Sequence, residues 1–437
     1  MLMNVGFISL GCTKNLIDTE MAIGLFKNNN YKIVNNVEEA EAIVINTCGF
    51  IESAKEEAIN TILEMAEYKE KGSCKYLVVM GCLVQRYKKE LQKALPEVDL
   101  FLSIDEYQNF WEKVETLIEN KEEKSEDKME YLDRVITTGK TTTYLKIAEG
   151  CSNRCTYCAI PNIRGPYISR PFEEIIEEAK QLAKDGYKEI IVIAQDTTKY
   201  GIDLYGKSRF AELLAELAKI IEFKWIRFLY AYPETITDEL IEIVKKNENI
   251  CKYFDIPIQH ISDKVLKRMN RKTTGKDIEN LIEKIKKEIP DAILRTSLIV
   301  GFPGETEEDF KALENFVSKA KFDKLGVFTY SKEEGTPAAR LPEQIHYKTK
   351  QKRYNKIMEI AKKTSKENLQ KTLGKTYEVL IEAKTFDNKY YIGRTYMDIP
   401  NEDGVVFVKN TKQIPKGTWA KCEITDIKDY DLIGEII

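Results

Sequence analysis

Long hydrophobic runs are missing from this chain of 437 residues. A helix that crosses a bilayer needs roughly 20 consecutive apolar residues, and no stretch of the sequence approaches that length. The opening residues, MLMNVGFISLGC, also lack the basic segment and the small-residue cleavage site of a secretory signal. We therefore expect a cytoplasmic protein that does not associate with a membrane.

The chain also lacks an even number of cysteines and a strong positive charge, and it contains little histidine. Nine cysteines, an odd number without a secretory signal, fit thiolate ligands in a reducing compartment better than a disulfide framework. The formal net charge of −4 gives no global basic field for nucleic acid, although a local patch is compatible with it. Only two histidines are present, and His260, beside a predicted strand, suits a structural role better than a catalytic one.

Residues 1–119 alternate between short apolar runs and helical patterns, which predicts an α/β domain. The apolar runs occupy residues 4–10, 41–46 and 75–80, and the helical patterns that follow them occupy residues 16–26, 51–68 and 85–95. Strands separated by helices of this length pair in parallel. The chain is too long for one core, so further domains are expected.

Each of these three strands leads into a cysteine, namely Cys12, Cys48 or Cys82. The carboxyl ends of parallel strands meet at one edge of the sheet, so the three thiols are expected to converge into a three-thiolate site. A buried core position is the alternative for any one cysteine, because cysteine is among the most often buried residues. We keep that alternative for the remaining cysteines outside the motifs, Cys74, Cys251 and Cys422.

A charged segment, residues 120–134, interrupts the hydrophobic pattern and predicts an exposed linker over 120–136. Six strand-like runs then alternate with helices through residue 367 and predict a partial, six-unit TIM-like barrel over 137–367. These runs are residues 143–150, 189–195, 224–232, 253–259, 293–302 and 324–331.

The loop after the first barrel strand, EGCSNRCTYCAIP, holds Cys151, Cys155 and Cys158 in a C-x3-C-x2-C spacing. Zinc ribbons use paired C-x2-C elements, and a structural zinc site is closed by four protein ligands. Three thiolates suit an iron–sulfur cluster with one iron left open, beside which Tyr157 could supply an aromatic face. Other polar residues end barrel strands and could face the same bowl, although ordinary loop or cap roles are the alternative: Gln195, Asp196, Gln259, Arg295, Ser297 and Glu305.

Five short strand patterns over 370–437 predict a small all-β barrel. Barrels of this kind often bind RNA. Residues 370–437 carry ten basic and eleven acidic residues, a net charge of −1. A nearly neutral domain attracts the phosphates of RNA only weakly. Residues 1–119 carry twelve basic and nineteen acidic residues, a net charge of −7, which would attract a basic protein or merely aid solubility.

Cys151, Cys155, Tyr157 and Cys158, on a six-unit barrel, resemble the radical S-adenosylmethionine superfamily. The upstream cysteines narrow the resemblance to its methylthiotransferases, in which the C-terminal barrel is a TRAM domain. The stretches SLGCTKNLIDTE, NTCGFIESAKEEAI and YLKIAEGCSNRCTYCAIPNIRG resemble the RimO branch over essentially the whole chain. The tRNA branch, MiaB, has a GCQMN-like first motif instead. Thr13, where the RimO branch often has proline, is a small departure at a position that is not a ligand.

The resemblance implies two 4Fe-4S clusters, on Cys12, Cys48 and Cys82 and on Cys151, Cys155 and Cys158. It implies that S-adenosyl-L-methionine, cleaved at the second of these sites, yields a radical that removes hydrogen from the β-carbon of an aspartate in the twelfth small-subunit ribosomal protein. The first site would supply sulfur, a second S-adenosylmethionine the methyl group, and the product would be 3-methylthioaspartate. No side chain is expected to act as a catalytic base. The expected cofactor contacts are Tyr157, Gln195, Gln259, Arg295 and Ser297.

The expected partners are this ribosomal protein, free or in the small subunit, and an electron donor such as flavodoxin or ferredoxin, and we expect a monomer. A tRNA methylthiotransferase acting on a modified adenosine is the nearest alternative. An iron–sulfur electron carrier and a zinc-binding structural protein are more distant ones.

Overall fold

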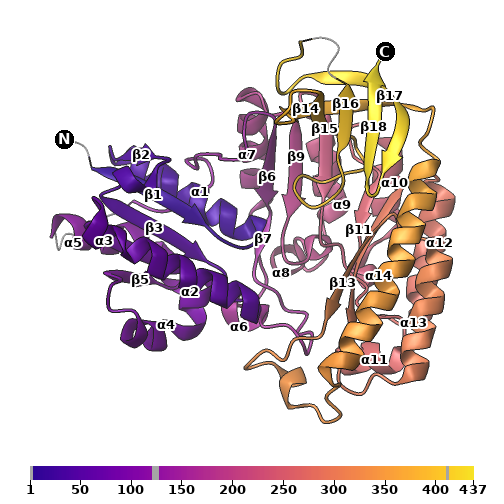
Figure 1. The fold of residues 1–437 in the computed structure, drawn as a ribbon, viewed down its shortest axis with the longest axis horizontal. Coiled ribbons are helices and arrows are strands. Elements are labelled where there is room, and N and C mark those ends of the chain that lie inside the picture. Colours follow the sequence, from indigo (N-terminus) through magenta and orange to yellow (C-terminus); the bar gives the residue numbers. More distant parts are fainter. Residues whose placement is uncertain (1–2, 121–126, 410–412) are drawn as a thin grey trace.

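The computed structural model describes residues 3–120, 127–409 and 413–437. An N-terminal α/β domain lies beside a larger core of strands and helices, and a small C-terminal barrel sits at one end of the core strands (Figure 1). In the part of the chain so described, no helix is long and apolar enough to cross a membrane.

The N-terminal domain is built on five parallel strands in the order β2-β1-β3-β4-β5. The three predicted strands are confirmed as β1, β3 and β4, and two short edge strands, β2 and β5, were not predicted. The elements are β1 (Asn4–Ser9), α1 (Thr13–Asn28), β2 (Lys32–Val34), β3 (Ala42–Thr47), α2 (Glu52–Ala66), α3 (Tyr68–Lys71), β4 (Tyr76–Gly81), α4 (Cys82–Ala94), β5 (Leu100–Leu102) and α5 (Phe110–Glu119).

Both faces of this sheet are covered, which explains its continuous apolar strands. α1 and α5 pack on one face through Phe26 and Trp111, and α2 and α4 pack on the other through Ile62 and Leu83. All six residues of β3, AIVINT, are buried as a result.

The core contains the six predicted parallel strands, which form two three-stranded sheets, β10-β9-β6 and β11-β12-β13. An isolated parallel bridge between Ile226 and Ile250 links the two sheets into an incomplete barrel. The elements are β6 (Thr142–Lys146), β7 (Ala148–Glu149), α6 (Ile160–Arg164), β8 (Ile168–Ser169), α7 (Phe172–Lys184), β9 (Glu189–Ile193), α8 (Ile202–Tyr205), α9 (Phe210–Ala218), β10 (Trp225–Phe228), α10 (Asp238–Lys246), β11 (Tyr253–Asp255), α11 (Asp263–Arg268), α12 (Gly275–Glu288), β12 (Ile293–Val300), α13 (Glu307–Ala320), β13 (Lys324–Thr329) and α14 (Tyr347–Gln370).

The predicted small barrel of five strands is confirmed, and its strands close in the order β14-β15-β16-β18-β17. They are β14 (Thr376–Lys384), β15 (Tyr390–Arg394), β16 (Val406–Lys409), β17 (Trp419–Lys428) and β18 (Asp431–Ile436). The barrel covers the amino ends of the core strands. There Arg394 pairs with buried Glu189 at 2.7 Å, and the rings of Trp419 and Trp225 meet at 4.2 Å.

The segment that leads into the core is not exposed throughout. Residues 121–126 of the predicted linker lie outside the described residues. At its far end the expectation of exposure is wrong, because Arg134 is buried. Its guanidinium pairs with Glu20 of α1 at 2.8 Å and with Glu178 of α7 at 3.1 Å, so it joins the N-terminal domain to the core.

Candidate active site

The loops that carry the first cysteine triplet lie against one another at the carboxyl edge of the N-terminal sheet. Cys12 precedes α1, Cys48 follows β3 and Cys82 begins α4. A Cβ on Gly11 would stand 2.7 Å from Cβ of Cys48, and a Cβ on Gly49 would stand 3.0 Å from the backbone of Cys82. Glycine at both positions is what lets the three loops approach so closely.

Burial differs sharply among these three thiols. Cys12 is exposed, Cys48 is partly buried and Cys82 is buried. Burial raises the pKa of the Cys48 thiol and raises that of Cys82 to about 12. Iron binds thiolates rather than thiols, so a metal bound here would displace these protons. Three sulfur donors on adjacent loops fit the ligand chemistry of an iron–sulfur cluster.

The second triplet lies in the loop between β7 and α6, at the opposite end of the core from the C-terminal barrel (Figure 1). Cys151 and Cys155 are buried and Cys158 is partly exposed. The N–H of Cys158 donates to the carbonyl of Cys155 at 3.0 Å, and the N–H of Cys151 donates to Gly165 at 3.1 Å. The loop is therefore folded back on itself.

Neighbouring loops hold this one from both sides. The N–H of Thr156 donates to the carbonyl of Met269 at 3.0 Å, and the carbonyl of Thr156 accepts from Ala338 at 2.9 Å. Burial raises the pKa of Cys151 to about 11 and that of Cys158 to about 12. The donors again suit a cluster, whose irons would take three thiolates from one short loop.

Aromatic residues surround this loop. Tyr157 packs against the apolar cluster of Val265, Met269 and Phe302, and its hydroxyl also interacts with the thiols of Cys155 and Cys158. The hydroxyl of Tyr232 lies 3.8 Å from Sγ of Cys155, and the guanidinium of Arg271 lies 4.2 Å from the Tyr232 ring centroid. Neither Tyr232 nor Arg271 was predicted, because nothing in the local sequence places them beside the cysteine loop.

Gln195 and Asp196, at the end of β9, both contact the cysteine loop or its approach. Nε2 of Gln195 donates to Glu149 at 2.9 Å, two residues before Cys151. Asp196 is buried and accepts from Nδ2 of Asn153, inside the loop, at 2.8 Å.

Gln259 and Ser297 lie side by side on neighbouring segments of the core. Gln259 has a positive φ of 69° and its N–H donates to the carbonyl of Ser297 at 2.9 Å. Both side chains are partly exposed at this end of the core. Arg295 points elsewhere: it pairs with Asp255 at 3.0 Å and with Glu402 of the C-terminal barrel.

Glu305 and His260 lie in buried packing rather than in the bowl. Glu305 is 2% exposed and accepts from the N–H of Phe302 at 2.9 Å while pairing with Arg353 at 3.1 Å. His260 is fully buried, and its Nδ1 accepts from the N–H of Ser262 at 3.0 Å. The other cysteines, Cys74, Cys251 and Cys422, are buried among apolar residues, as expected.

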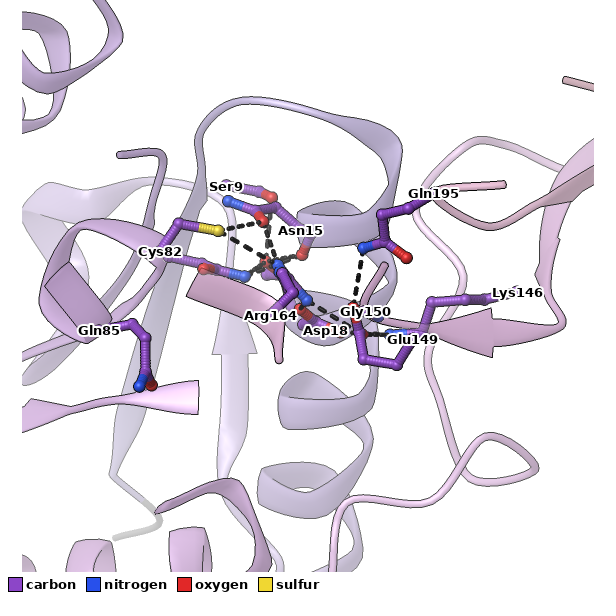
Figure 2. A network of polar contacts seen from close by, with 12 residues as sticks. Ser9, Asn15, Asp18, Cys82, Gln85, Lys146, Glu149, Gly150, Arg164 and Gln195 are labelled. Carbon is purple, nitrogen blue, oxygen red and sulfur yellow. Dashed lines mark hydrogen bonds and ion pairs between the residues drawn. The ribbon is translucent and has the colours of Figure 1, made fainter. Parts of the chain in front are cut away.

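Four charged side chains form a closed ring between α1 and the core (Figure 2). Asp18 of α1 accepts from Lys146 and from Arg164, each at 2.7 Å. Glu149 accepts from the same two cations at 3.0 and 3.1 Å. Burial alone would raise the pKa of Glu149, but Lys146 and Arg164 hold it below its usual range.

Arg164 also contacts the first triplet directly. It donates to Oδ1 of Asn15, and its Nη2 lies 3.5 Å from Sγ of Cys82 (Figure 2). Asp18 comes six residues after Cys12, and Arg164 comes six residues after Cys158. The ring therefore ties the chain just beyond one triplet to the chain just beyond the other.

No group of three His, Cys, Asp or Glu side chains within residues 3–120, 127–409 and 413–437 converges closely enough to hold a single metal ion. A cluster makes no such demand, because each of its thiolates binds a different iron.

An incomplete barrel of six parallel strands with three thiols in the loop after the first strand defines the class of radical S-adenosylmethionine enzymes. Solved structures share the fold. The methyltransferase TsrM from Kitasatospora setae is 11% identical, with 77% of this chain and 74% of that chain covered and a TM-score of 0.58. The radical enzyme OxsB is 14% identical, with 83% and 56% covered and a TM-score of 0.52. The family model described as the radical SAM superfamily matches residues 145–317.

Two further family models match the flanking domains, the uncharacterized protein family UPF0004 at residues 4–103 and the TRAM domain at residues 373–437. Relatives that match the full length of the chain show which radical S-adenosylmethionine enzymes it resembles. "Ribosomal protein uS12 methylthiotransferase RimO" from Alkaliphilus oremlandii is 64% identical, with 99% of both chains covered. The protein of the same name from Clostridioides difficile is 52% identical, with 100% and 99% covered. The chain belongs to the RimO family and is a radical S-adenosylmethionine methylthiotransferase, which uses an iron–sulfur cluster and S-adenosylmethionine.

Proposed function

We propose that this enzyme methylthiolates the β-carbon of an aspartate in ribosomal protein uS12 and forms 3-methylthioaspartate. The observation that carries the proposal is 64% identity over the full chain to a relative named for activity on uS12. A tRNA methylthiotransferase is the alternative outcome of the test below.

Two 4Fe-4S clusters would be held by the two triplets, Cys12, Cys48 and Cys82 in the N-terminal domain and Cys151, Cys155 and Cys158 on the core. When bound, the core cluster supplies the electron that cleaves S-adenosylmethionine to a carbon radical, and the other supplies sulfur for the methylthio group. Support comes from the donor chemistry and from the close approach of Gly11 to Cys48 and of Gly49 to Cys82. We infer domain limits of 1–119, 137–367 and 370–437.

The protein's own side chains would position the reactants rather than exchange protons with them. A β-carbon beside a carboxylate is too weakly acidic for any side-chain base near neutral pH, so no general base is needed. Gln259 and Ser297, adjacent and partly exposed, are the proposed contacts of S-adenosylmethionine, with Tyr157 and Gln195 supporting the loop. Because Arg295 is engaged by two carboxylates, we propose that any contact it makes to the cofactor requires release of Glu402.

Charge supports a basic protein as substrate more than it supports RNA. The N-terminal domain has a net charge of −7 and the C-terminal barrel one of −1, so the acidic surface lies on the domain that carries the first triplet. Opposite charge on a ribosomal protein would speed its association. We propose a monomer that is reduced by a small electron carrier such as flavodoxin or ferredoxin.

Three cysteine variants test the proposal under anaerobic, reducing conditions. Replacing Cys151, Cys155 and Cys158 by Ala should remove the iron of one cluster and abolish 5′-deoxyadenosine formation. Replacing Cys12, Cys48 and Cys82 should remove the iron of the other and stop methylthio transfer while cofactor cleavage continues. The matched control replaces Cys74, Cys251 and Cys422, and should keep all iron.

Each protein is incubated separately with uS12 and with tRNA, and the mass of the substrate is measured. A mass gain on uS12 at a single aspartate supports the proposal. A gain on tRNA alone, or full iron content in either triplet variant, contradicts it.

A further inference from the structure

A buried lysine stands at the start of α1, two residues after Cys12. Lys14 is only 7% exposed, and its Nζ lies 3.2 Å from the centroid of the Tyr230 ring. Tyr230 follows β10 and has a positive φ of 62°, a conformation that non-glycine residues rarely adopt. The ammonium of Lys14 therefore reaches from the N-terminal domain onto the core.

The acids nearest to Lys14 are already engaged by other cations. Asp255 accepts from Arg295 at 3.0 Å and from the N–H of Tyr230 at 2.9 Å. Glu149 is shared by Lys146 and Arg164 in the ring described above. Within the described ranges of the chain, Lys14 itself forms no ion pair with any carboxylate.

The backbone around Lys14 also favours an anion. Lys14 lies in the first turn of the 16-residue helix α1, where Cys12 is the N-cap and makes no side-chain capping bond. The first turn contains no acidic residue. Free N–H groups and the positive end of the helix dipole attract negative charge. The thiolate of Cys12, as a cluster ligand, would meet the positive helix start itself. The ammonium of Lys14 is left with the Tyr230 ring and no carboxylate of its own among the described residues, so it can accept one from a bound substrate.

We propose that Lys14 binds the side-chain carboxylate of the substrate aspartate and so selects an acidic residue for reaction between the two cysteine triplets. This inference rests on the proposed function. In aspartate the β-carbon is bonded directly to the carboxylate carbon, so fixing the carboxylate fixes the carbon that reacts. Cys12, the exposed member of its triplet, is close enough to Lys14 to interact with it electrostatically, so a carboxylate held by Lys14 would lie near the site where sulfur would be delivered.

The test is a double-mutant cycle, in which one substitution in the enzyme and one in the substrate are measured singly and together. Lys14→Met keeps the length of the side chain and removes its charge, and uS12 carrying Asn in place of the modified Asp removes the charge from the substrate. Binding of fluorescently labelled uS12 to the reconstituted enzyme is measured as an equilibrium constant, beside iron content and 5′-deoxyadenosine formation without uS12. Lys350→Met is the matched control, because Lys350 also lies over an aromatic ring, that of Tyr330 at 4.8 Å.

Lys14→Met should weaken uS12 binding by on the order of tenfold or more, as expected for loss of a charge-assisted hydrogen bond. The Asn substrate should bind the native enzyme as weakly, and combining both changes should cost little more than either alone. Iron content and cofactor cleavage should stay at the native level, and Lys14→Arg should recover part of the binding.

Additive losses, or unchanged uS12 binding by Lys14→Met, would overturn the inference. Weakened S-adenosylmethionine binding with normal uS12 binding would also overturn it, since the carboxylate would then belong to the cofactor. Modification of uS12 by the native enzyme in the same series tests the proposed function separately.

Discussion

Asp18→Asn should loosen the N-terminal domain from the core. The substitution leaves Lys146 and Arg164, both almost fully buried, to share Glu149 alone. Removing one partner of a buried ion pair typically costs about 3–5 kcal/mol, because a charge stays in a medium that solvates it poorly. Opening of the interface around α1 should become easier by that amount.

Hydrogen exchange of the α1 backbone measures this directly, since it reports local opening without requiring the whole chain to unfold in one step. A change of about 3–5 kcal/mol corresponds to exchange faster by on the order of 10²–10⁴-fold. The control is Glu41→Gln, which breaks an ion pair to Lys75 of the same 2.7 Å length but with far greater exposure. Exposed pairs contribute little, so its effect should be small.

A charge-balanced double variant sharpens the test. Asp18→Asn together with Lys146→Met leaves Arg164 and Glu149 as a complete pair, so part of the lost protection should return. If Asp18→Asn exchanged no faster than Glu41→Gln, the reasoning that burial makes the ring an essential link would be refuted.

Three further changes have defined outcomes. Burial lowers the pKa of His260 to about 3, so the stability that neutral His260 contributes is complete above pH 6.5 and is lost as pH falls towards 3, by about 5 kcal/mol in all. His260→Gln should flatten this part of the stability curve measured by urea unfolding, whereas exposed His346→Gln should not. Gly11→Ala should reduce the iron bound by the N-terminal triplet, because the new Cβ would clash with Cys48. Gly139→Ala is the control, because Gly139 has a similar positive φ but a Cβ there would meet no atom within 4 Å, and this variant should keep its iron. Equal iron content in both variants would contradict the argument that Gly11 lets the cysteine loops pack closely. Arg394→Met should speed hydrogen exchange in β14–β18 by leaving Glu189 with Arg227 alone, and Lys409→Met, on an exposed pair, should not.

Apolar runs predicted the main strands of the N-terminal domain and the core, because a strand buried on both faces must be apolar. The strands of the C-terminal barrel alternate between exposed and buried residues, and short strand patterns separated by turn signals predicted them. The short edge strands β2 and β5, three residues each, escaped because so few residues carry no periodicity. The expected convergence of the strand-end cysteine loops follows from the shared edge of a parallel sheet, and the close approach of Gly11 to Cys48 agrees with it.

The burial and the ion-pair partners of charged residues could not be predicted from the sequence. Arg134 lies in a run of charges that is typical of an exposed linker, yet it is buried between Glu20 and Glu178. Lys14 and Arg164 resemble ordinary helix-end residues until the domains are docked. Their neighbours belong to elements that are distant in the sequence, so no local pattern predicts which charged residues will form ion pairs.

Helix α1 also determines whether the domains can be produced as separate fragments. Ile17 and Met21 belong to one continuous buried cluster with Ile191 of the core and Val379 of the C-terminal barrel. A fragment without the N-terminal domain would present this apolar surface to water and would tend to aggregate. The N-terminal domain alone would expose the apolar side of the same helix. The three domains therefore share one apolar cluster, and we expect truncation at the linker to be a poor route to a soluble enzyme.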